Sequence, residues 1–256
     1  MTGTGWFFGA ALGAKYAGNA SLIAWAILGV ITIYITLCFA ELVSLFPNAG
    51  GVYEFGKRSY GNFTSFVVGW ITWLDGTLTA SLIIVAAIEY LFIGYSTLIK
   101  IMLALGILAL LHYVAYRGVE ASSFLLIAFA IVTIGMIFMI IIPGLFAVNT
   151  THFTPFFPPD FSWLAIGITL FFIVETFFGW EAATFLGEET EHAEKVIPKT
   201  MIWSTIVLTI LVFVLIFTVL GMIPWHELAG STTPLNDIGK ILFGSKGSYL
   251  VGFLVF

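Results

Sequence analysis

The sequence predicts an all-α, polytopic membrane protein, and three observations support this fold class. Hydrophobic residues make up 60% of the 256 residues and charged residues only 9%, against about a quarter charged in ordinary soluble domains. The apolar residues form long continuous runs, and a helix of about 20 such residues crosses the roughly 30 Å hydrocarbon core of a bilayer. The runs also lack the two-residue alternation of a transmembrane β-barrel.

The same composition excludes several other classes of protein. Nine Lys and Arg against fourteen Asp and Glu give a formal net charge of −5, which is too few cations for a nucleic-acid-binding module. Neither a soluble globule nor a disordered chain carries so much apolar sequence. The single cysteine, Cys38, excludes a disulfide framework, and the four histidines have no metal-ligand spacing. We therefore expect a lipid bilayer around the chain and no nucleic acid, cofactor or metal.

Six apolar runs are long enough to cross a bilayer as helices. They cover residues 21–46, 63–95, 98–116, 122–143, 163–187 and 196–223. Two shorter runs, 3–17 and 249–256, cannot cross a bilayer alone, so both ends of the chain lie inside apolar sequence. We therefore predict that residues 1–256 form a single transmembrane domain that is part of a longer protein. It would have six full spans plus partial first and eighth spans.

Glycine and glutamate inside two apolar runs are the features that indicate function. Gly3 and Gly5 open the first short run, and residues 178–181 read Phe-Gly-Trp-Glu within the span 163–187. Glycine tolerates a break in a helix and the close approach of a ligand, and a glutamate at membrane depth usually has a functional partner. Taken singly, each motif is equally well explained by close helix packing or by a structural hydrogen bond.

Two interrupted helices in corresponding halves of a chain are typical of secondary transporters built from inverted repeats. A break frees backbone N–H and C=O groups at membrane depth. The freed N–H groups at a half-helix N-terminus attract a carboxylate, and freed carbonyl groups bind an ammonium group or a cation. Because an α-amino acid carries both charges, the pair of breaks predicts a site for a zwitterion.

Further short motifs accompany the two breaks. In chain order the motifs are GTGWF (3–7), EL (41–42), PNAGGVY (47–53), GW (69–70), FGWE (178–181), EE (188–189) and PK (198–199). With these motifs the sequence resembles, from end to end, the amino acid permeases of the amino acid-polyamine-organocation (APC) superfamily, in particular its prokaryotic members.

The resemblance implies a partial five-plus-five inverted-repeat transporter fold with broken helices one and six. The chain would contain helices one to seven and the start of the eighth. The link 47–62 would be a short amphipathic segment on the cytoplasmic side, and the link 224–247 would cap the outer vestibule. The resemblance further implies membrane transport of amino acids or related amines by alternating access, no enzymatic activity, and a place in the plasma membrane of a prokaryote.

The resemblance also assigns the substrate site to the two breaks. Backbone N–H groups of Thr4, Gly5 and Trp6 would bind the substrate carboxylate, and carbonyl groups of residues 177–179 would receive its ammonium group. One aromatic ring, that of Phe178 or Trp180, would close over the substrate as a gate. The expected substrate-binding residues are therefore Gly3, Thr4, Gly5, Trp6, Phe177, Phe178, Gly179 and Trp180.

Two glutamates near the second break are candidates for proton linkage. Glu181 lies beside the glycine, and burial favours the uncharged form of a carboxyl group, so Glu181 is the first candidate for a proton-linked or substrate-orienting carboxylate. In the alternative, Glu181 stays ionised and accepts hydrogen bonds from freed backbone N–H groups. Glu175, six residues earlier, is the second candidate.

Several properties stay open at the level of the sequence. The span 122–143 has no lysine of the kind that some proton-coupled relatives carry there, and the eighth-helix hydroxyls that bind sodium in other relatives would lie beyond Phe256. The coupling ion, proton or sodium, is therefore undecided, as are the substrate side chain and the oligomeric state. A non-transporting receptor or partner subunit that senses an amino acid-like ligand is the alternative function. An intramembrane enzyme is disfavoured, because no nucleophile, metal or acid pair has a workable spacing.

Overall fold

The computed structural model describes residues 5–48, 50–92, 95–117, 119–231 and 233–244, together with Gly247 and Val251. Every regular element in this part of the chain is helical, so the predicted all-α class is confirmed there. The elements are α1 (Gly5–Ala17), η1 (Gly18–Ala20), α2 (Ser21–Leu45), α3 (Val52–Tyr60), α4 (Asn62–Leu91), α5 (Thr97–Tyr116), α6 (Val119–Phe146), η2 (Thr150–Phe153), α7 (Trp163–Ile173), η3 (Val174–Phe177), α8 (Trp180–Thr184), η4 (Gly187–Glu189), α9 (Ala193–Met222), α10 (Trp225–Leu228) and α11 (Pro234–Phe243).

Six helical segments of the described chain are long and apolar enough to cross a membrane, and they follow the predicted runs. They are Phe8–Leu45, Asn62–Ile88, Thr97–Tyr116, Ser123–Phe146, Trp163–Thr184 and Ala193–Met222. The first joins α1 to α2 through η1, where Gly18 has a φ of 58°. With 13 residues, α1 alone is about 20 Å long at 1.5 Å per residue. The described part of α1 is therefore shorter than the apolar core of a bilayer.

One of the predicted boundaries differs from the structure. The run 122–143 was expected to end at its proline, but α6 continues to Phe146 with Pro143 inside its last turn. A proline there removes the one backbone hydrogen bond that an N–H at this position would give to the Met139 carbonyl, and the helix ends three residues later. The span 163–187 is interrupted as predicted, since α7, η3, α8 and η4 follow one another there. Of the run 249–256, only Val251 lies within the described residues.

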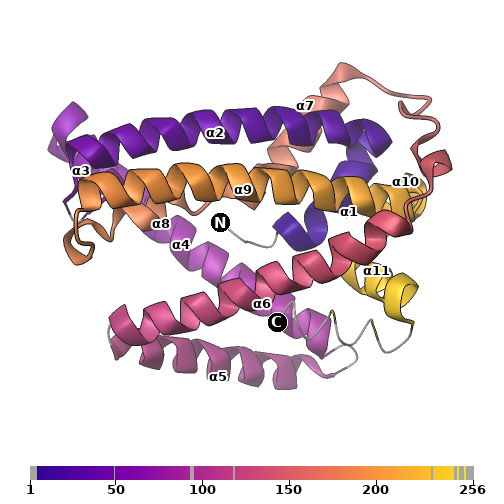
Figure 1. Cartoon of the computed structure of the whole chain (residues 1–256). Coiled ribbons are helices and arrows are strands. Elements are labelled where there is room, and N and C mark those ends of the chain that lie inside the picture. Colours follow the sequence, from indigo (N-terminus) through magenta and orange to yellow (C-terminus); the bar gives the residue numbers. More distant parts are fainter. Residues whose placement is uncertain are drawn as a thin grey trace.

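The long helices α2 and α9 form the central pair of the molecule, and they lie side by side in Figure 1. Their contact is polar at its centre. The Thr36 hydroxyl donates to the Thr32 carbonyl (2.9 Å) and lies 3.1 Å from the Thr205 hydroxyl. Either hydroxyl can be the donor in this second contact. Such interhelical hydrogen bonds hold helices together where lipid offers no hydrophobic driving force.

The short helix α1 packs against α2 and α7. It meets α7 partly through the Tyr16 ring, which stacks on Phe172 with centroids 4.7 Å apart, and it meets α2 through small residues. Ala10 and Ala14 are buried on it. A Cβ atom added at Gly9 would lie 2.8 Å from the Trp25 ring, and one added at Gly13 would lie 3.0 Å from Ser21. The close packing of α1 on α2 therefore depends on these two glycines.

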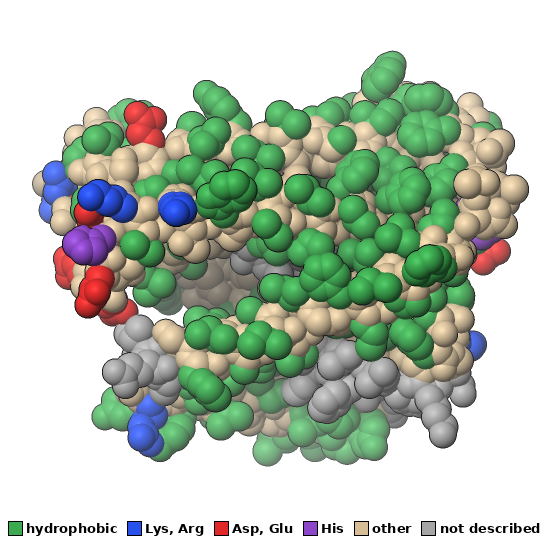
Figure 2. Space-filling model, in the orientation of Figure 1, with side chains coloured by type: hydrophobic (Ala, Val, Ile, Leu, Met, Phe, Trp, Pro, Cys, Tyr) green, Lys and Arg blue, Asp and Glu red, His purple; other side chains and the backbone are tan. Residues whose placement is uncertain are grey.

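Short helices form part of the links between the spans. The amphipathic helix α3 in the link 47–62 buries Phe55 and carries an ion pair between Arg58 Nε and Glu54 Oε1 (2.8 Å). The charged side chains of α3 and of the start of α9 gather at one end of the molecule in Figure 2, while the surface along the spans is mostly hydrophobic. This distribution is that of a protein with one membrane boundary at this end.

The opposite end is tied together by a buried asparagine. Asn19 Nδ2 donates to the carbonyl groups of His152 (2.8 Å) and Pro155 (3.1 Å), and His152 Nδ1 lies 2.9 Å from the Gly221 carbonyl. The start of α2, the link 147–162 and the end of α9 are thereby joined. In the link 224–247, α11 packs on α1 and α6 and buries Leu235 and Ile238.

Candidate functional site

The helix that contains Gly179 is interrupted, as the sequence predicted. The α-helix α7 ends at Ile173, the 3₁₀ turn η3 continues to Phe177, and α8 begins at Trp180. Gly179 has a φ of 120°, a backbone conformation that residues with a Cβ atom adopt only under strain. The interruption releases backbone N–H and C=O groups from the regular helical pattern between α7 and α8.

One of the released groups is capped by the neighbouring glutamate. Glu181 Oε2 accepts a hydrogen bond from the Gly179 N–H (3.2 Å). The Glu181 carbonyl also accepts a hydrogen bond from the Thr184 hydroxyl (2.6 Å), which stabilises the short helix α8. The sequence left two roles open for Glu181, and this contact supports the structural one. Glu175 lies half-buried in η3, and its proton linkage stays a prediction.

The two aromatic rings at the break differ in their surroundings. Trp180 is 5% exposed and stacks on Phe39 of α2 with ring centroids 6.4 Å apart. Phe178 is 43% exposed, and its ring is tilted against that of Trp180 at 6.2 Å. Trp180 is therefore held in the core, and Phe178 is the more exposed of the two rings.

The N-terminal end of α1 meets this interruption. A Cβ atom added to Gly5 would lie 2.6 Å from the Cα atom of Thr176 and 2.8 Å from its Cβ atom. Only glycine permits so close an approach of two backbones. Gly5, where the described part of α1 begins, therefore lies beside Thr176, just before the interruption at Phe178 and Gly179. The predicted break near Gly3 lies outside the described residues.

Buried polar atoms without a partner flank the break on both sides. In the described part of the chain, Thr176 Oγ1 and Trp180 Nε1 make no hydrogen bond although both atoms are buried. Buried polar atoms in proteins are nearly always paired, and an exception calls for an explanation such as a missing ligand or water. These two atoms lie where the sequence places the substrate.

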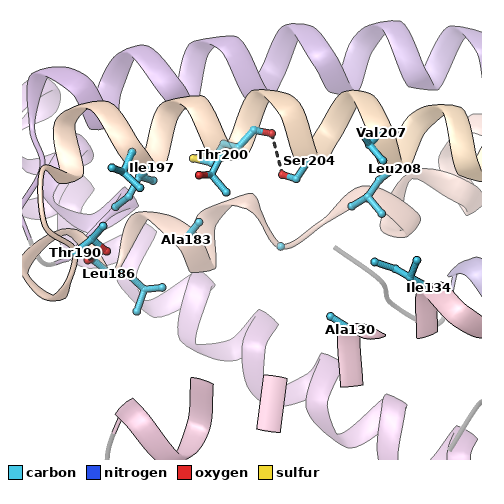
Figure 3. A pocket seen from close by; sticks show the side chains of 13 residues that line it. Ala130, Ile134, Ala183, Leu186, Thr190, Ile197, Thr200, Ser204, Val207 and Leu208 are labelled. Carbon is cyan, nitrogen blue, oxygen red and sulfur yellow. Dashed lines mark hydrogen bonds between the residues drawn. The ribbon is translucent and has the colours of Figure 1, made fainter. Parts of the chain in front are cut away.

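A pocket of about 550 Å³ adjoins Gly179 on the side of α6 and α9. Figure 3 shows its labelled side chains, with Thr200, Ser204 and Leu208 of α9 above and Ala130 and Ile134 of α6 below. The Ser204 hydroxyl donates to the carbonyl group of Met201 (3.1 Å). None of the side chains that line the pocket is charged, so it offers a mainly apolar volume beside the break.

A family model for amino acid permeases matches residues 1–256, which is the whole chain. The chain belongs to the amino acid permease family. It is 28% identical to the glutamate/serine transporter AimA of Bacillus subtilis over 92% of this chain and 47% of that protein. It is 26% identical to the branched-chain amino acid permease BcaP of the same organism (92% and 55%), and 28% identical to the L-methionine/branched-chain amino acid exporter YjeH of Escherichia coli (99% and 62%).

This permease chain thus spans about half the length of the curated relatives it matches. The match confirms the family that the sequence resembles and shows a family of transporters, not of enzymes. With its six candidate spans the permease is an integral membrane protein. Among the described residues, no group of three or more His, Cys, Asp or Glu is placed to hold a metal ion.

The structure describes six of the eight expected binding residues of the permease at least in their backbone. Gly5 and the backbone of Trp6 open α1, Phe177 ends η3 and is buried, and residues 178–180 form the break and the start of α8. Gly3 and Thr4 lie outside the described residues. The structure therefore brings the two expected halves of the site together, while their role in binding stays a prediction.

Sequence reasoning missed Thr176. Its position beside the site comes from a contact with Gly5, which is far away in the sequence. The span 163–187 also contains Thr169 and Thr184, so no local pattern distinguished Thr176 from the other threonines of the run.

Replacing Gly179 by alanine tests the strained conformation at the break. We expect Gly179→Ala to lower the free energy of unfolding by about 1–3 kcal/mol, because a Cβ atom strains a backbone with this positive φ. The matched control is Gly167→Ala in α7, where no atom lies within 4 Å of the added Cβ, so stability should be equal or slightly higher. Thermal unfolding of both variants in detergent measures the difference. Equal midpoints for the two variants would contradict the assigned backbone conformation.

Proposed function

We propose that this chain is the substrate-binding part of a permease that moves amino acids, or related amines, across the membrane by alternating access. One observation carries the proposal, namely the contact between Gly5 at the start of α1 and Thr176 beside the break at Phe178 and Gly179. It supports a single site to which both interrupted helices contribute backbone groups.

The proposed site recognises the charged groups that all α-amino acids share. N–H groups in the first turn of α1, including those of Gly5 and Trp6, would bind the carboxylate at the positive end of the helix dipole. Carbonyl groups of residues 177–179 would accept hydrogen bonds from the ammonium group. The unpaired Thr176 hydroxyl and Trp180 indole N–H would complete the site. Phe178, the more exposed ring, is the better candidate for a gate.

In the complete permease, the chain would form helices one to seven and the start of the eighth of a five-plus-five inverted repeat. This places residues 1–256 in one transmembrane domain that further helices complete. We also propose the plasma membrane of a prokaryote as its location, because curated relatives in Bacillus subtilis and Escherichia coli match over most of the chain.

Uptake into proteoliposomes tests the proposed function directly. The curated relatives are named for glutamate, serine, branched-chain amino acids and methionine, so these labelled amino acids are the first probes for the permease expressed with the flanking sequence of its gene. We expect time-dependent uptake of at least one of them above empty liposomes. Binding without uptake would favour a non-transporting receptor or partner subunit instead.

The substitution Gly5→Val tests the contact that carries the proposal. We expect amino acid binding to weaken at least tenfold, about 1.4 kcal/mol, because a branched side chain would push α1 away from Thr176. Isothermal titration in detergent measures the affinity, with Gly167→Val in α7 as the matched control in open space. Both variants must elute as monodisperse protein. Wild-type affinity in a folded Gly5→Val protein would exclude this junction as the substrate site.

The substitution Glu181→Gln separates the two roles of this residue. Glutamine keeps an acceptor oxygen for the Gly179 N–H, so we expect the break to persist and uptake to keep its dependence on pH. Uptake by wild type and variant between about pH 5 and 8, where a carboxyl group with a raised affinity for protons titrates, decides the matter. A flat profile in the variant would instead identify Glu181 as the proton-linked group.

A further inference from the structure

Two lysines near the start of α9 have no role in the proposed binding site. Lys195 and Lys199 lie one turn apart on α9, and both side chains are exposed. Within the described part of the chain, neither makes a hydrogen bond or an ion pair. Lys195 lies in the first turn, where the helix dipole disfavours a cation. Stabilisation of α9 therefore does not explain it.

An apolar stripe continues the line of lysines along α9. Trp203 and Val207 follow Lys199 on the same side of the helix, at successive steps of one turn. Trp203 is 60% exposed and Val207 is 51% exposed. A tryptophan near lysines is typical of the membrane boundary, where the amphipathic ring lies at the level of the lipid headgroups. This side of α9 therefore passes from the boundary into the apolar core of the bilayer.

A groove of about 410 Å³ follows this side of α9. Its lining residues are Lys199, Thr200, Trp203, Ser204 and Val207. Thr200, Ser204 and Val207 also line the larger pocket of about 550 Å³, so the groove and the pocket adjoin each other. Figure 2 shows a hollow between α9 and α6, with mostly hydrophobic side chains around it.

The floor of the larger pocket is apolar, and its rim is open. Ile197 and Met201 are buried at the floor, whereas Ala130 of α6 and Leu186 are exposed at the rim. Among the described residues, no charged side chain lines this pocket. A hydrocarbon chain can fill such a hollow without leaving a charged group unpaired.

The acidic side chains at this end of the molecule lie before Lys199 in the chain. Glu188, Glu189 and Glu191 precede α9, and Glu194 lies in its first turn. Lys199 is about 8 Å farther along the helix than Glu194, at 1.5 Å per residue. An anionic group beside Lys199 therefore has the cation next to it and the acids beyond it.

We propose that this side of α9 binds one anionic phospholipid from the leaflet at the charged end of the molecule. The ammonium group of Lys199 and the hydroxyl of Thr200 hold the lipid phosphate, and Lys195 adds a second positive charge. One acyl chain follows Trp203 and Val207 and enters the larger pocket. The inference does not depend on the proposed transport function, because binding of a lipid is measured without uptake.

Native mass spectrometry of the permease, expressed with the flanking sequence of its gene and purified in detergent, tests this site. The probes are phosphatidylglycerol, which is anionic, and phosphatidylcholine with the same acyl chains, which has no net charge. We expect the wild type to retain one phosphatidylglycerol molecule in preference to phosphatidylcholine. Lys199→Gln should weaken this retention about fivefold, the effect of one basic residue at an anionic surface.

Matched variants separate the charge from the acyl chain. Lys57→Gln removes an exposed cation of α3 at the same end of the molecule and should retain the lipid like wild type. Lys199→Ala replaces the glutamine variant if that protein is not monodisperse. Ala130→Trp should weaken retention about fivefold, because its ring takes the space of the chain. Ile131→Trp is its control, since Ile131 is 67% exposed and lies outside the pocket.

Other results contradict the inference in distinguishable ways. Equal retention of the two lipids by wild type would show that the site has no preference for an anionic headgroup. Wild-type retention in a folded Lys199→Gln protein would exclude this lysine. An equal loss in Lys57→Gln and Lys199→Gln would indicate attraction by the whole charged end instead of a site on α9. Wild-type retention in folded Ala130→Trp would place the acyl chain outside the pocket.

Discussion

The close approach of Gly5 to Thr176 is the contact on which the rest of the arrangement depends. It brings the N-terminal end of α1 against the segment that precedes the break at Gly179. Gly9 and Gly13 of α1 lie against Trp25 and Ser21 of α2. These two glycines allow the two helices to pack closely, and this packing holds the N-terminal end of α1 in place. A larger residue at any of these glycines would move α1 away from the break. The packing of one short helix therefore decides whether the two sets of free backbone groups meet.

The break in turn creates a need for partners at membrane depth, because lipid cannot satisfy free N–H and C=O groups. Glu181 supplies one partner for the Gly179 N–H. The hydroxyl of Thr176 and the indole N–H of Trp180 are buried without any partner in the described chain. We interpret this imbalance as the mark of a ligand site. An amino acid is the ligand that we propose, since its two charged groups would match the N–H end of α1 and the carbonyl groups beside Gly179.

Features that depend on local composition could be predicted from the sequence. Features that depend on contacts between residues distant in the chain could not. The spans followed from the length of the apolar runs, and the break followed from Gly179 within an aromatic run. The predicted end of α6 was wrong, because the helix continues for three residues beyond Pro143. Thr176 could not be identified from sequence, since its partner Gly5 is distant in the chain.

Hydrogen–deuterium exchange tests most directly the claim that α1 and the break form one amino acid site. The permease in detergent would be compared with and without an amino acid that it has been shown to bind. We predict slower exchange of backbone N–H groups in both segments 5–9 and 176–184 on addition of the amino acid, and unchanged exchange in α5 (Thr97–Tyr116). Protection of only one of the two segments, or of neither, would contradict the account.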